Sequence, residues 1–121
     1  MEKRTLVLGA SPNPERFSNK AVLRLLKRGI PVIAVGKREG TIGGLKINRD
    51  FPEDNANIHT VTLYMNAVNQ KEYYEKIISL KPKRIIFNPG TVNPELAALA
   101  AKEGIIVIEN CMLEMLGSGR F

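Results

Sequence analysis

The stretch RTLVLGASPNPERFSNKAVLRLLKRGIPVIAV, residues 4–35, has two apolar runs on either side of an amphipathic segment. The runs lie within residues 4–10 and 30–35 and are apolar throughout, as in strands buried on both faces. The segment between them has one apolar stripe at helical spacing, with Ser18 as the expected cap and Gly29 as the expected end. The stretch therefore predicts a strand, a helix and a second, parallel strand.

The same alternation continues along the chain. Segment 36–57 is rich in Gly, Asn and Pro and is expected to form a long loop in place of a helix. We expect one domain over residues 1–121, with a doubly wound α/β fold built on a parallel sheet of about five strands. The remaining expected elements are strands over 58–65, 83–90 and 104–111, and helices over 68–82, from the cap Asn93 to Gly104, and over 112–116.

Composition indicates an ordinary globular protein of the cytoplasm. The 121 residues are 44% hydrophobic, enough for a core without disulfides, and the single cysteine fits a reducing compartment. No apolar run approaches the ~18 residues that a membrane helix needs, and the N-terminal residues lack the layout of a signal peptide. The sequence therefore predicts a cytoplasmic protein with no membrane partner.

The net charge of +6 allows two interpretations. An anionic small-molecule partner is one, and a merely solvated basic surface is the other. Nucleic acid is disfavoured as the partner, because there is no tryptophan and no basic cluster is interleaved with aromatic residues. The sequence identifies no protein partner.

Small and polar residues follow the predicted strands where each one ends. Parallel strands joined by right-handed crossovers have their carboxyl ends at one edge of the sheet, where doubly wound folds bind ligands. These residues predict a binding cleft at that edge, although each one alone is also an ordinary turn residue. The five loops expected there are Gly9–Phe17, Gly36–Gly44, Tyr64–Ala67, Asn88–Val92 and Asn110–Leu113.

The loop after the first strand is the best candidate for a phosphate site. Gly9 permits a tight turn, while Ser11, Asn13 and free amides near Ser18 could hold a phosphate with the help of the helix dipole. The loop matches neither the dinucleotide fingerprint G-x-G-x-x-G nor a P-loop. The predicted site residues in this loop are Gly9, Ala10, Ser11, Pro12, Asn13 and Ser18.

Two cations follow the second strand. NAD-binding domains place an acidic residue near this point to bind the ribose hydroxyls, whereas this chain has Lys37 and Arg38. Positive charge here favours a phosphorylated ribose, as in NADP or in the 3′-phosphoadenosine of coenzyme A. Two solvated cations at the start of a loop remain the alternative.

Several motifs, in this order, resemble the small coenzyme A-binding family. They are GASPNPERFSNKA (9–21), VGK (35–37), VTLYMN (61–66), NPGTVNPE (88–95) and ENC (109–111). That family is similar to the N-terminal domain of the succinyl-CoA synthetase alpha subunit, and the resemblance runs from Arg4 to about Leu113. It implies a Rossmann-like sheet and coenzyme A as the cofactor.

The resemblance also implies roles for individual residues. Gly9, Ala10 and Ser11 would wrap the phosphates of the coenzyme, and Lys37 would meet its adenosine phosphate. The groove beside the adenosine and pantetheine would be lined by Tyr64, Met65 and Asn66, and the pantetheine arm would be flanked by Asn88, Pro89 and Gly90.

The chain departs from the pattern at two places. Members of the family often have Asn and Pro after the second strand, whereas this chain has Gly36 and Lys37, as in the synthetase. The synthetase's phosphohistidine lies in a second domain that this sequence lacks. The resemblance therefore does not imply the ligase reaction.

The sequence contains no evident catalyst. His59, the single histidine, falls near the start of a strand, away from the expected ligand edge, and is read as a surface or structural residue. One histidine and one cysteine, widely separated, are too few for a zinc site. Cys111 follows the last strand at the ligand edge, where the family also has a cysteine. It is either a packing residue or a thiol that faces the thiol of coenzyme A.

We therefore expect a non-catalytic module that binds coenzyme A or acyl-CoA and serves as a carrier, sensor or regulatory subunit. Whether the chain is an enzyme is left open, although the sequence favours a protein that is not an enzyme. Two alternatives remain: an NADP-dependent reductase, and an interaction protein with a vestigial nucleotide cleft.

Overall fold

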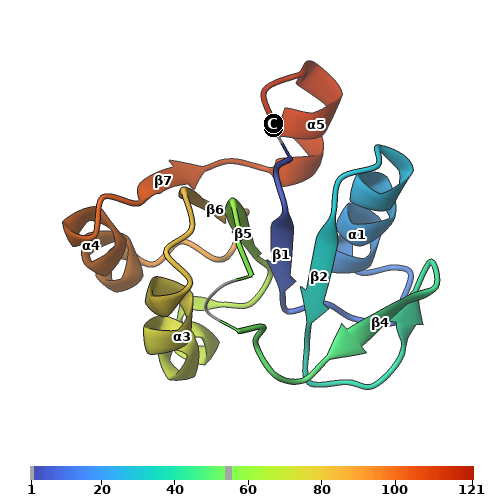
Figure 1. The fold of residues 1–121 in the computed structure, drawn as a ribbon, viewed down its shortest axis with the longest axis horizontal. Helices are drawn as coiled ribbons and strands as arrows, with labels where there is room; N and C mark the ends of the chain where they lie inside the picture. The colour runs from blue at the N-terminus through green and yellow to red at the C-terminus, as the bar shows by residue number, and fades with distance from the viewer. Residues whose placement is uncertain (1, 54–55) are drawn as a thin grey trace.

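The computed structural model describes residues 2–53 and 56–121, and these form one seven-stranded sheet in the order β3–β4–β2–β1–β5–β6–β7 (Figure 1). All neighbouring strands are parallel except β3 and β4. The doubly wound α/β fold expected from the sequence is confirmed. The strands are β1 (Thr5–Leu8), β2 (Val32–Val35), β3 (Thr41–Ile42), β4 (Leu45–Asn48), β5 (Thr60–Leu63), β6 (Arg84–Phe87) and β7 (Ile106–Glu109).

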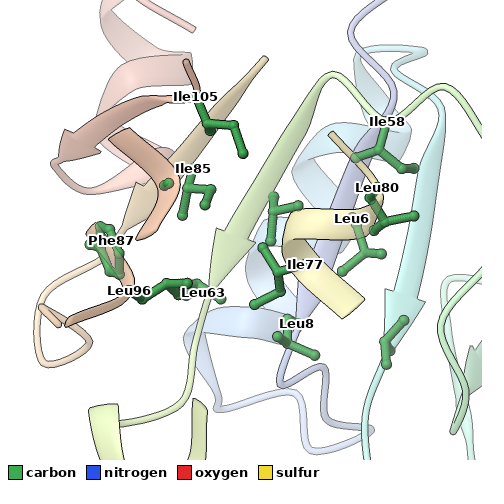
Figure 2. Close-up of a cluster of buried hydrophobic side chains, with 13 residues drawn as sticks. Leu6, Leu8, Ile58, Leu63, Ile77, Leu80, Ile85, Phe87, Leu96 and Ile105 are labelled. Carbon is green, nitrogen blue, oxygen red and sulfur yellow. The ribbon is translucent and has the colours of Figure 1, made fainter. Parts of the chain in front are cut away.

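Helices cover both faces of the sheet. Alternate residues of β1 point to opposite faces, so Leu6 and Leu8 join one core cluster and Val7 joins the other. The first cluster, drawn in Figure 2, packs α3 and α4 on the sheet, and the second packs α1 and α5. The helical elements are α1 (Phe17–Lys27), α2 (Ala67–Gln70), the 3₁₀ turn η1 (Lys71–Tyr73), α3 (Tyr74–Ser79), α4 (Pro94–Lys102) and α5 (Met112–Ser118).

The prediction of a long loop over 36–57 is wrong. This segment contains β3 and β4, a hairpin whose second strand pairs parallel with β2, so the sheet has seven strands rather than about five. Gly43 and Gly44 form the turn with φ of 55° and 85°, the positive values that tight hairpins require. Ile42 and Ile47 are each only 2% exposed, so this short hairpin contributes two buried side chains to the core. Asp54 and Asn55, from the same predicted loop, lie outside the described residues.

The helix expected over 68–82 is in fact three short pieces. Gln70, at the end of α2, is fully buried, whereas the Tyr73 ring stacks on Phe51 with the ring centroids 5.5 Å apart. The Tyr74 hydroxyl donates to Glu95 and accepts from the side-chain amide of Asn93. Gln70, Tyr73 and Tyr74 thus each contact a different part of the fold. The 3₁₀ turn between α2 and α3 lets the three side chains point toward these separate partners.

The helix caps were predicted with mixed success. Asn93 caps α4 as expected, and its side-chain oxygen accepts from the amides of Glu95 and Leu96. Ser18 is not the cap of α1: the helix begins at Phe17, and Ser18 is a buried residue of its first turn. The capping position belongs to Arg16, whose side chain makes no capping hydrogen bond.

Candidate functional site

A pocket of about 480 Å³ opens at the carboxyl edge of the sheet, where the loops after β1, β2, β5 and β6 meet. The strand order reverses between β1 and β5, and doubly wound folds bind ligands at such a point. Most of the predicted site residues come together here. The described residues that line the pocket are Gly9, Ala10, Ser11, Asn13, Arg16, Phe17, Ser18, Lys37, Arg38, Tyr64, Met65, Asn66, Asn69, Pro89, Gly90 and Thr91.

Two glycines bring the backbones of these loops into contact. Gly9 has a φ of 97°, and a Cβ there would lie 3.1 Å from the carbonyl carbon and oxygen of Tyr64. A Cβ on Gly36 would lie only 2.1 Å from the carbonyl oxygen of Ala10. The amides of Gly9 and Ala10 both donate to the carbonyl of Val35. The floor of the pocket therefore depends on glycine at both positions.

The amino end of α1 is arranged to receive negative charge. No side chain caps this eleven-residue helix and its first turn has no acidic residue, in a part of the chain that the structure fully describes. Arg16 and Ser18 line the pocket at this end. The Asn19 side chain donates to the carbonyl of Ser11 over 3.0 Å and so ties the loop to the helix. The helix dipole and uncapped amides favour an anion at this place.

A buried glutamine joins the loops after β5 and β6. The side-chain amide of Gln70 donates to the carbonyls of Met65, over 2.9 Å, and Thr91, over 2.7 Å. Its side-chain oxygen accepts from Asn93 over 2.9 Å. Gln70 is fully buried and does not line the pocket, so it positions two pocket walls without contacting what binds there.

The charge of the pocket is one-sided. Arg16, Lys37 and Arg38 line it, and none of the described residues that line it is acidic. The Lys37 ammonium pairs with the Glu72 carboxylate of η1 over 3.0 Å, and both side chains are largely exposed. Hydrogen bonding in this pair raises the pKa of Lys37 and lowers that of Glu72.

Tyr64 forms a wall between the pocket and the core. It lines the pocket and packs against the core cluster that holds α1 and α5. Burial raises the pKa of its phenol, and the nearby Cys111 adds to the rise. The phenol is therefore neutral at physiological pH.

Three predicted site residues do not line the pocket. Asn88 is 2% exposed; its amide donates to the Thr62 hydroxyl and the Leu63 carbonyl, and its oxygen accepts from the amide of Met112. Pro12 packs beside Gly40. Cys111 is half-buried before α5, near Tyr64, so the prediction that its thiol meets a ligand gains no support from the pocket.

Sequence analysis missed four residues that line the pocket. Phe17 is 67% exposed and falls at the end of a predicted loop, but no pattern in the sequence indicates that it lines the pocket. The sequence did contain a signal for Arg16, because it is a basic residue at the start of a helix whose first turn has no acidic residue. Asn69 and Thr91 depend on the α2 turn and on Gln70, which the sequence pattern does not specify.

Metal and membrane features are absent from the part of the chain described here. Among residues 2–53 and 56–121, no group of three or more His, Cys, Asp or Glu side chains is placed to hold a metal ion. The helices within these same residues are all too short or too polar to span a bilayer.

The fold and pocket define a Rossmann-like α/β domain with a cationic pocket at its switch point. The CoA binding domain family matches residues 3–116, and the chain belongs to this family. No curated protein matches the chain.

Solved structures share the fold over almost the whole chain. An uncharacterized protein is 43% identical, with a TM-score of 0.95 and coverage of 100% of this chain and 99% of that one. A hypothetical protein from Pyrococcus horikoshii OT3 is 30% identical, with a TM-score of 0.84 and coverage of 97% and 82%. A conserved hypothetical protein from Pyrococcus furiosus, 24% identical with a TM-score of 0.79 and coverage of 94% and 98%, shows the likeness of fold alone.

Proposed function

We propose that this chain binds coenzyme A or acyl-CoA in the pocket at the carboxyl edge and acts as a non-catalytic carrier, sensor or regulatory module. The observation that carries the proposal is the one-sided charge of the pocket. Three cations and the uncapped amino end of α1 line it, without an acidic residue among the described lining. Membership of the CoA binding domain family supports coenzyme A as the anion concerned.

The residues present fit the parts of coenzyme A. Gly9, Ala10 and Ser11, with the first turn of α1, would hold the pyrophosphate through backbone amides. Lys37 would meet the phosphate on the ribose, since a charged hydrogen bond to phosphate is the strongest contact this loop offers.

The other side of the pocket suits the less charged parts of the ligand. Tyr64, Met65 and Asn66 would lie along the adenosine and pantetheine, and Pro89 and Gly90 would flank the pantetheine arm. These walls combine apolar surface with side-chain amides, as pockets for extended cofactors do.

The titratable groups of the described lining favour a binding role over a catalytic one, because the raised pKa values of Lys37 and Tyr64 make both side chains poor bases at neutral pH. Asp, Glu, His and Cys do not occur among the described residues that line the pocket. A general acid or base must come within hydrogen-bond reach of the reacting group. His59 lies at the opposite end of the sheet, at the start of β5.

Native mass spectrometry of the purified protein tests the proposal. The expected result is a co-purifying or added species with the mass of coenzyme A or an acyl-CoA, bound one per chain. Calorimetry then compares coenzyme A, dephospho-coenzyme A and NADP, and coenzyme A should bind most tightly. Tighter binding of NADP would favour the reductase alternative, and no binding of any of the three would overturn the proposal.

A further inference from the structure

Lys37 and Glu72 form a salt bridge between two segments that lie far apart in the sequence. Lys37 follows β2 and lines the pocket, whereas Glu72 lies in η1, after β5, and does not line it. The two charged groups are 3.0 Å apart. Of the three pocket cations, Lys37 is the one in a salt bridge within the described residues.

The position of Glu72 is set by its neighbours. Gln70 fixes the preceding turn through the carbonyls of Met65 and Thr91. Tyr73 fixes the following side by stacking on Phe51, with the ring planes only 21° apart. Contacts of Gln70, just before the 3₁₀ turn, and of Tyr73, its last residue, therefore fix the backbone that carries Glu72, whose side chain is 57% exposed.

We propose that Glu72 is a specificity-determining residue, because its ion pair with Lys37 must be exchanged for the ribose phosphate of the ligand. This inference rests on the proposed function. Glu72 competes for the Lys37 ammonium and adds a negative charge close to the incoming phosphate. Both effects weaken the binding of coenzyme A and leave a ligand without that phosphate untouched.

The size of the effect follows from exposure. Exposed ion pairs are weak and screened by salt, so removal of the carboxylate is expected to tighten coenzyme A binding by about two- to five-fold. Glu75 provides a matched control, because it is an exposed glutamate three residues further along whose carboxylate forms no salt bridge in the described structure.

Calorimetric titration of five proteins with coenzyme A and with dephospho-coenzyme A tests the inference: wild type, Glu72→Gln, Glu75→Gln, Lys37→Met and the double variant Lys37→Met with Glu72→Gln. Glu72→Gln should tighten coenzyme A only, and Glu75→Gln should change neither affinity. In a Lys37→Met background, Glu72→Gln should tighten coenzyme A less, because only the repulsion between the carboxylate and the phosphate is then relieved. An unchanged affinity in Glu72→Gln, or equal tightening of both ligands, would overturn the inference while coenzyme A binding itself stands. Failure of the wild-type protein to bind either ligand would overturn the proposed function and the inference together.

Discussion

The two edges of the sheet both carry positive charge, but they use it differently. At the amino edge, Arg84 is 8% exposed, and its guanidinium donates to the Thr60 hydroxyl over 2.8 Å and lies 4.4 Å from the centroid of the Phe121 ring. Lys3 donates to the main-chain oxygen of Phe121. At the carboxyl edge, Arg16 and Arg38 are exposed and face a pocket.

This difference shows that net charge alone does not locate a ligand. Arg84 and Lys3 at the amino edge contact a hydroxyl, a ring and a main-chain oxygen, and so they contribute to the stability of the fold. Those at the carboxyl edge have solvent or a single exposed carboxylate as neighbours, and so their charge is available to a ligand. Substitution of Arg84 at the amino edge should therefore lower stability, and removal of a pocket cation at the carboxyl edge should lower affinity.

The largest effect is expected at the backbone contact beneath the pocket. Gly36→Ala places a methyl group 2.1 Å from the carbonyl oxygen of Ala10, and neither loop can avoid it without a backbone shift. We expect a loss of about 3 kcal/mol in the free energy of unfolding, measured by urea denaturation, with loss of coenzyme A binding. In Gly117→Ala, the methyl group meets nothing within 4 Å, so this control should stay within about 1 kcal/mol of wild type. Equal stability of the two variants would contradict the close backbone contact between Gly36 and Ala10.

Arg84→Met should separate stability from binding. The variant loses the hydrogen bond to Thr60 and the cation–π contact with Phe121, so we expect a loss of about 2 kcal/mol in the free energy of unfolding. Coenzyme A affinity should be unchanged. Lys83→Met, at the exposed neighbouring position, should change stability by less than about 0.5 kcal/mol. A folded Arg84→Met protein with weakened coenzyme A binding would contradict the claim that the amino edge takes no part in binding.

Lys37→Met, in contrast to Arg84→Met, should lower coenzyme A affinity and leave stability unchanged. The side chain is 67% exposed, so its removal should leave the thermal midpoint unchanged. Coenzyme A affinity should fall about tenfold, through loss of a charged hydrogen bond to the ribose phosphate. Dephospho-coenzyme A should bind wild type and variant equally in the same calorimetric series. A similar loss for both ligands would remove Lys37 from the phosphate role.

The smallest effect concerns the pH dependence of stability at the amino edge. Burial, followed by the charges of Arg84, Lys3 and Lys83, lowers the pKa of His59 in the folded protein. The unfolded chain therefore binds the proton more readily, and the stability contributed by neutral His59 is lost as the pH falls below about 6.5. His59→Gln should lose less stability than wild type between pH 7.5 and pH 5.5 in urea denaturation. An identical or larger loss in the variant would contradict this assignment.

The strand ends account for what the sequence could predict. Gly9, Lys37, Tyr64 and Pro89 each follow an apolar run by one or two residues, and parallel strands bring such positions to one edge whatever the details of packing. The pocket was therefore predictable from local patterns together with one rule of topology. The family resemblance added coenzyme A as the proposed ligand.

The remaining features depend on contacts between distant residues. The β3–β4 hairpin has strands of only two and four residues, too short for a clear alternation, and is recognisable chiefly from Gly43–Gly44. Asn88 follows a strand as the pocket residues do, but the amide of Met112 draws its side chain inward. Glu72, which pairs with Lys37, lies in the 3₁₀ turn that interrupts the expected helix, and the sequence pattern did not predict this turn.

The central claim is that the carboxyl edge binds coenzyme A and the amino edge does not. A titration of ¹⁵N-labelled protein with coenzyme A, followed by amide chemical shifts, tests it directly. The largest shifts are expected at Gly9, Ser11 and Lys37 and in the first turn of α1, and the amides near Arg84 should not move. Shifts centred on Arg84 and its neighbours, or no shifts at saturating coenzyme A, would show that the carboxyl edge is not the binding site.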